Sequence, residues 1–78
     1  MLTSTDIDTL NTLARGLAQR RFGGSGSVGR NINGIVRLTI VKHERGAGSL
    51  YWVRETLSPR FDDASREIAK AIESAANP

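Results

Sequence analysis

Two apolar segments within residues 34–58 decide the fold: IVRLTIVK (35–42) and LYWVRETL (50–57), which flank the loop HERGAGS (43–49). Both segments are rich in β-branched and aromatic residues, and the loop is short and contains glycine, which is typical of an antiparallel β-hairpin. Helical patterns lie on either side. We therefore predict an α+β fold in the order helix, two-stranded antiparallel β-hairpin, helix (αββα), with both helices packed on one sheet face.

The hairpin register decides which face of the sheet carries Trp52, because a slip of one residue exchanges the two faces. We favour the register in which Ile40 pairs with Tyr51, since it leaves Arg54 out of the core and turns Trp52 outward beside Arg37. In the alternative register Trp52 packs beneath the helices.

The two helices have recognisable start signals. Thr3 is the expected N-cap of a first helix from about Ser4 to Arg21, with Asp6 at its third position. Asp62 is the expected N-cap of the second helix, where paired aspartates suit the positive end of the helix dipole.

Residues 23–34 contain five glycines, and we predict a flexible Gly-rich loop within a single small domain that spans residues 1–78. Gly24, Gly26 and Gly29 match the spacing of the dinucleotide-binding fingerprint. That motif requires a strand before it and a helix after it, whereas here the expected order is reversed. We therefore interpret the glycines as part of a linker.

The composition narrows the class of protein. Seventy-eight residues without cysteine exclude a disulfide framework and a thiolate metal site. No apolar run is long enough to cross a membrane, so a soluble, cytoplasmic protein is expected. A chain this short buries a small core, and a homodimer is an alternative way to cover its apolar side chains.

The positive charge is concentrated in the middle of the chain. The whole chain has a net charge of +3, whereas residues 15–60 carry nine cationic side chains against two carboxylates. Nine of the eleven cations are arginine, whose planar guanidinium pairs with phosphate or carboxylate in a bidentate manner. This distribution predicts an anionic partner, either nucleic acid (DNA or RNA) or an acidic protein surface.

The predicted binding residues are cations at a helix end, in the Gly-rich loop and on the hairpin, together with one aromatic residue that stacks a base. They are Arg20, Arg21, Arg30, Arg37, Lys42, Arg45, Trp52 and Arg54.

No catalytic constellation emerges from the sequence. His43 is the one histidine, and no spacing places a nucleophile or a carboxylate beside it. Asp62 and Asp63 are accounted for as a helix start. We expect no enzyme activity, no cofactor and no metal site.

Two resemblances of layout and one of size add to this interpretation. The order helix, hairpin, helix resembles that of the small head-to-tail joining proteins of tailed phages. The run from residues 51–54 to residues 61–64 resembles the strand-to-helix end of AP2-type and double-stranded-RNA-binding domains. Those families have a three-stranded sheet, and the basic helix start of the RNA-binding domain is here the acidic pair Asp62 and Asp63. Small size without catalytic residues also resembles phage-encoded inhibitors such as anti-CRISPR proteins.

Two functional hypotheses follow. The first is a non-enzymatic basic module that contacts nucleic acid through the hairpin and the Gly/Arg loop. The alternative is a phage or mobile-element protein-interaction module, an inhibitor or head-tail adaptor, that acts in the host cytoplasm by occupying a partner's surface.

Overall fold

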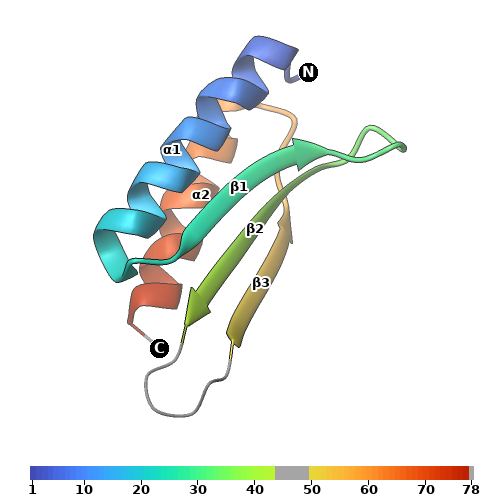
Figure 1. Cartoon of the computed structure of the whole chain (residues 1–78). Coiled ribbons are helices and arrows are strands. Elements are labelled where there is room, and N and C mark those ends of the chain that lie inside the picture. The colour runs from blue at the N-terminus through green and yellow to red at the C-terminus, as the bar shows by residue number, and fades with distance from the viewer. Residues whose placement is uncertain (44–49, 78) are drawn as a thin grey trace.

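The computed structural model describes the backbone of residues 1–43 and 50–77, and the side chains of residues 1–42 and 54–77. In chain order its elements are α1 (Ser4–Phe22), β1 (Ser25–Arg30), β2 (Val36–His43), β3 (Leu50–Thr56) and α2 (Phe61–Ala76) (Figure 1). The strands form an antiparallel sheet in the order β1-β2-β3. The predicted α+β order of helix, antiparallel strands and helix is confirmed. The predicted two-stranded sheet is wrong, because a third strand precedes the other two.

The additional strand, β1, lies inside the segment that was expected to be a flexible loop. Gly26 and Val28 are buried in it. A Cβ atom on Gly26 would lie 2.7 Å from the carbonyl oxygen of Ala14 and 3.3 Å from the Cβ of Ala18. Glycine at this position therefore lets the strand approach α1 closely, and residues 25–30 form a strand where a loop was expected.

The outer edge of β1 is covered by α1. The backbone N–H of Val28 donates a hydrogen bond to Oδ1 of Asn11, at 2.8 Å, in partly buried surroundings. A strand at the edge of a sheet presents backbone groups without a strand partner, which the chain must satisfy in another way. Asn11 satisfies one of them and attaches β1 to the helix.

The turn between β1 and β2 is organised by one side chain. Oδ1 of Asn31 accepts hydrogen bonds from the backbone N–H groups of Asn33 and Ile35, at 2.9 Å and 3.0 Å. Gly34 has φ of 80°, in the left-handed region that glycine adopts readily. This turn leaves the side chain of Ile32 fully exposed, at 101%.

The register of β2 and β3 differs from the favoured prediction by two residues. Ile40 pairs with Val53 instead of Tyr51. A shift of two residues keeps each residue on the same face, because side chains alternate with a period of two. Trp52 pairs with Val41 in the backbone ladder, and the prediction that its side chain is exposed lies outside the described side chains.

The start of α1 follows the prediction. The Thr3 hydroxyl accepts a hydrogen bond from the N–H of Asp6, and the Asp6 carboxylate accepts one from the N–H of Thr3. The start of α2 differs, since Arg60 occupies the N-cap position without a side-chain hydrogen bond and Asp62 lies in the first helical turn. The prediction that Asp62 is the N-cap is therefore wrong by two residues.

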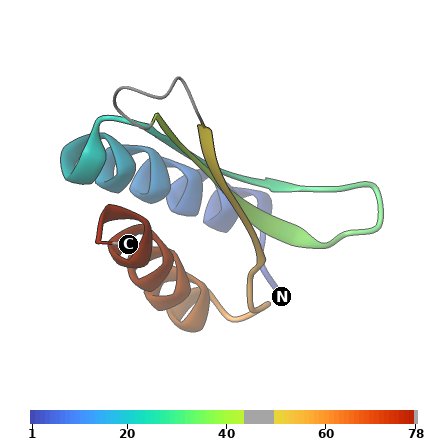
Figure 2. The same cartoon turned by 90° about the horizontal axis from the view of Figure 1, so that it is seen from below.

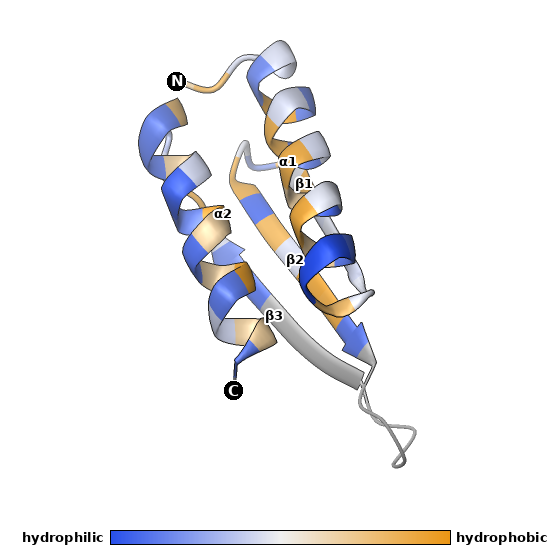
Figure 3. Ribbon diagram, turned by 90° about the vertical axis from the view of Figure 1, so that its left-hand side faces the viewer, coloured by the Kyte–Doolittle hydropathy of each residue, from blue (hydrophilic) through white to orange (hydrophobic). Residues whose placement is uncertain are grey.

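Helices and sheet form two layers around a small core (Figure 2). α1 packs against β1 and α2, and both helices contact β2. The apolar residues of the helices face the space between the layers (Figure 3). The largest fully buried side chains are Leu10, Leu38, Ile40, Ile68 and Ile72. No helix in the described part of the chain is long and apolar enough to cross a membrane.

Candidate functional site

The sheet carries two sets of alternating residues, and one set forms what we call the outer face. In β2 the buried set is Val36, Leu38 and Ile40, so the outer set is the one that alternates with them. Directly paired residues in neighbouring strands share a face. The outer-face residues with described side-chain positions are Ser25, Ser27, Gly29, Arg37, Thr39, Val41, Arg54 and Thr56.

Two rows of this face, each made of residues paired across the strands, contain both cations and hydroxyl groups. Ser27 pairs with Thr39, which pairs with Arg54 on the far strand. In the next row Arg37 pairs with Thr56. Arg37 and Arg54 are thus diagonal neighbours across β2 and β3, and both are exposed. Diagonal positions lie about 7–8 Å apart, a separation within reach of two long side chains.

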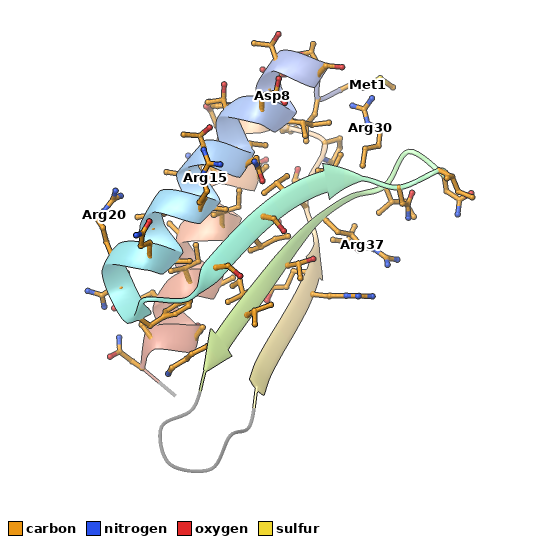
Figure 4. The ribbon with its side chains drawn as sticks, in the orientation of Figure 1. Met1, Asp8, Arg15, Arg20, Arg30 and Arg37 are labelled. Carbon is orange, nitrogen blue, oxygen red and sulfur yellow. The ribbon has the colours of Figure 1, made fainter. Side chains whose placement is uncertain are left out.

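The described outer-face side chains include no carboxylate. Glu55 lies between two outer-face residues in β3, but it pairs with the buried Leu38 and belongs to the other set. Arg37 takes no part in the ion pairs formed among the described side chains. Figure 4 shows it projecting from the sheet on the side away from α1. The described side chains of the outer face therefore carry a net positive charge.

Arg30 does not join this face. Its register partner is Val36, which belongs to the buried set. The guanidinium instead donates a hydrogen bond from Nη2 to the backbone oxygen of Leu2, and Figure 4 shows Arg30 beside Met1 at the start of the chain.

Arg20 and Arg21 lie at the far end of α1. Arg21 forms an ion pair with Glu73 of α2, with a distance of 2.7 Å between Nη2 and Oε1. Arg20 is exposed at the C-terminal end of α1 (Figure 4). These two cations sit on the helical layer and not among the outer-face residues.

Lys42 also forms a hydrogen bond within the fold. Its Nζ donates a hydrogen bond to the backbone oxygen of Ala75, at 2.8 Å. It lies in β2 next to the outer-face residue Val41, so by alternation it belongs to the opposite face of the sheet, the face of Leu38 and Ile40.

Of the eight predicted binding residues, the structure thus brings together Arg37 and Arg54. Arg45 and the side chain of Trp52 lie outside the described residues. Ser27, Thr39 and Thr56 were not predicted as binding residues. Alternation within the two strands of the hairpin is enough to place Thr39 and Thr56 on the face of Arg37 and Arg54, whereas Ser27 joins them only through β1, which was not recognised as a strand.

The structure also bears on the other motifs. Gly26 and Gly29 lie within β1 and Gly24 immediately precedes it, so these glycines do not open a helix as a dinucleotide site requires. Gly26 and Gly29 belong to a strand instead of the expected linker. Among the described residues no group of three or more His, Cys, Asp or Glu side chains could hold a metal ion.

Comparison of the chain with protein-family models, with curated proteins and with solved structures gives no match.

Proposed function

We propose that this protein is a non-enzymatic nucleic-acid-binding module, and that its outer sheet face is the binding surface. The observation that supports the proposal best is the composition of that face, where Arg37 and Arg54 share one side of the sheet with Ser27, Thr39 and Thr56 and the described side chains include no carboxylate. Guanidinium groups bind phosphate in a bidentate manner, and Ser and Thr hydroxyls donate to phosphate oxygens.

The ligand that we favour is single-stranded nucleic acid. A flat sheet with cations and a stacking residue is a common platform for single strands, whose unpaired bases expose their rings. The backbone pairing of Trp52 with Val41 assigns Trp52 to the row next to that of Arg54. In the proposal the arginines contact phosphate and Trp52 stacks a base.

Duplex RNA is the less favoured ligand. The third strand gives the sheet the strand number of double-stranded-RNA-binding domains. In that resemblance, however, the second helix begins with basic residues, whereas here Asp62 and Asp63 lie in the first turn of α2. Two carboxylates at that position repel a phosphate backbone.

The test is a titration of a fluorescently labelled mixed-sequence single strand of about 12 nucleotides, which is within the range of site sizes of single-strand-binding folds. Fluorescence anisotropy at several salt concentrations gives the affinity and its salt dependence. We expect the logarithm of the association constant to fall linearly with the logarithm of salt concentration. Arg37→Ala and Arg54→Ala should each reduce that slope by about 0.7, the value for one phosphate contact on a single strand.

Arg66→Ala is the matched control. Arg66 is an exposed arginine of α2 that pairs with Asp63, at 2.7 Å, so its removal changes the net charge equally at a site away from the outer face. The control should leave the slope nearly unchanged. Equal losses in all three variants, or binding that does not depend on salt, would count against the outer face as a nucleic-acid surface.

The competing proposal is that the same arginines meet an acidic protein surface. Absence of binding to single-stranded and duplex nucleic acid, together with recovery of a nuclease-resistant complex that the Arg37→Ala variant loses, would favour this alternative.

A further inference from the structure

A second surface lies at the end of the molecule that holds the β1–β2 turn. The exposed large hydrophobic residues of the described part of the chain are Met1, Ile32, Ile35 and Phe61. They belong to three segments, the residues before α1, the turn after β1 and the first residue of α2, which lie toward the same end of the molecule (Figures 1 and 2). Exposed apolar residues mark interaction sites where they are contiguous, and two of these four, Met1 and Ile35, line a common pocket.

This end also contains an open pocket of about 450 Å³. Its walls are mostly apolar: Leu2, Val36 and Leu57 are almost fully buried, and Ile35 is 37% exposed. Thr56 and Pro59, on either side of Leu57, complete one side of the pocket. A large aliphatic or aromatic side chain fits such a site.

One cationic side chain lies at this pocket. Arg30 lines it, and the residues that line it in the described part of the chain include no carboxylate. Nη2 of Arg30 donates to the backbone oxygen of Leu2, which holds the guanidinium in place. A guanidinium has five N–H donors, so donors remain after this bond. The site thus combines apolar walls with a positioned positive charge.

We propose that this pocket binds a short segment of a partner protein in which a large apolar side chain is followed by a carboxylate. The apolar side chain enters between Ile35 and Leu57, and the carboxylate pairs with Arg30. This docking site shares Thr56 with the outer sheet face, but Arg30 and the apolar lining belong to other parts of the molecule, so it does not depend on the proposed nucleic-acid binding.

The dimensions of the molecule favour a short segment over a second copy of the chain. The molecule is elongated, with extents of 41 Å, 22 Å and 17 Å, and the pocket lies toward one narrow end, whereas each partner in a typical stable interface buries about 800 Å² of surface. A single anchoring side chain with one charged neighbour needs much less area.

The experiment uses three blocked tetrapeptides as probes: acetyl-Gly-Leu-Asp-Gly-amide, the same peptide with lysine in place of aspartate, and the same peptide with alanine in place of leucine. Each is titrated into the isotopically labelled full chain, and backbone amide shifts are followed by NMR up to a few millimolar, about the affinity range of such small ligands. We expect the first peptide to shift the amides of Arg30, Ile35, Val36 and Leu57. The lysine peptide should bind about fivefold more weakly, as expected when one exposed ion pair is lost.

Three variants test the roles of the charge and of the apolar wall. Arg30→Gln should abolish the preference for the aspartate peptide, while Arg37→Gln, the same change on the outer sheet face, should keep it. Ile35→Ser should weaken the leucine peptides without unfolding the protein, because Ile35 is partly exposed.

Each remaining outcome overturns the proposal. No shift from the first peptide excludes the site, and equal binding of the aspartate and lysine peptides excludes the role of Arg30. Shifts confined to the outer face place any peptide binding elsewhere. Retention of the protein by phospholipid vesicles, with loss of retention in Ile32→Ser, would assign the exposed apolar end to a membrane surface instead.

Discussion

Lys42 and Ala75 connect the end of β2 to the end of α2: the lysine Nζ donates a hydrogen bond to the alanine backbone oxygen, at 2.8 Å. The last carbonyl groups of a helix have no partner within the helix, and a cation is favourable at that end of the dipole. The same Nζ lies 5.9 Å from the centroid of the Phe22 ring, at the end of α1. One side chain therefore connects β2 with the C-terminal ends of both helices.

Replacement of Lys42 by methionine should destabilise the protein without affecting the outer face. The substitution keeps the aliphatic stem but removes the charged donor, and we expect a loss of about 1–2 kcal/mol in the free energy of unfolding, measured by urea denaturation. Lys70→Met, at an exposed position of α2, is the control and should change stability by less than about 0.5 kcal/mol. A larger effect of Lys42→Met on nucleic-acid binding than on stability would contradict this assignment.

The sequence predicted those elements whose signals are local. The capping pair Thr3 and Asp6 marked the start of α1, and the apolar runs marked β2 and β3. Strand β1 was missed because its sequence, SGSVGR, has low strand propensity. It forms a strand because β2 pairs with it and because Ala14 and Ala18 of α1 leave room for its backbone, and both conditions depend on residues that are distant in sequence.

Prediction of the candidate site from sequence has the same limit. Sequence alone groups cations by charge, and it cannot show that Arg21 is paired with Glu73 or that Lys42 is bonded to the end of α2. Arg37 and Arg54 were grouped correctly because alternation within each strand assigns them to one face, and a two-residue error in register preserves that assignment.

Gly26→Ala should be strongly destabilising. The added Cβ would lie 2.7 Å from the carbonyl oxygen of Ala14 and 3.0 Å from its carbonyl carbon, so backbone atoms of α1 or β1 would have to move. Overpacking of this kind costs about 1–3 kcal/mol, which thermal or urea unfolding would measure.

Gly29→Ala, in the same strand, is the control for the preceding substitution. A Cβ at Gly29 meets no described atom within 4 Å, and its backbone φ is not in the left-handed region. We expect a change within about 0.5 kcal/mol. If both variants lost the same stability, the close approach of α1 to β1 would not be the reason for the glycine.

Gly16→Ala should stabilise the protein. Gly16 lies in the interior of α1, and alanine is favoured over glycine there by roughly 0.5–1 kcal/mol. The nearest described atoms to the added Cβ belong to the guanidinium of Arg20, at 3.2 Å, which is the flexible end of an exposed side chain and can move. The midpoint of urea unfolding should rise, and a fall in that midpoint would show that the helix needs glycine at this position.

Asn11→Ala should reduce the protection of one backbone amide at the edge of the sheet, that of Val28. The N–H of Val28 loses its acceptor, and an unsatisfied, partly buried donor costs about 1–3 kcal/mol. The change in the free energy of global unfolding underestimates the cost of the lost hydrogen bond, because alanine is also the better helix former. Amide hydrogen exchange isolates it, and we expect Val28 to exchange faster relative to its neighbours in β1. Asn11→Asp, which keeps an acceptor oxygen, should restore much of the protection, and Gln19→Ala on the exposed side of α1 should leave it unchanged. Equal protection of Val28 in the Asn11→Ala variant would mean that the edge of β1 is held by its packing against α1 and not by this hydrogen bond.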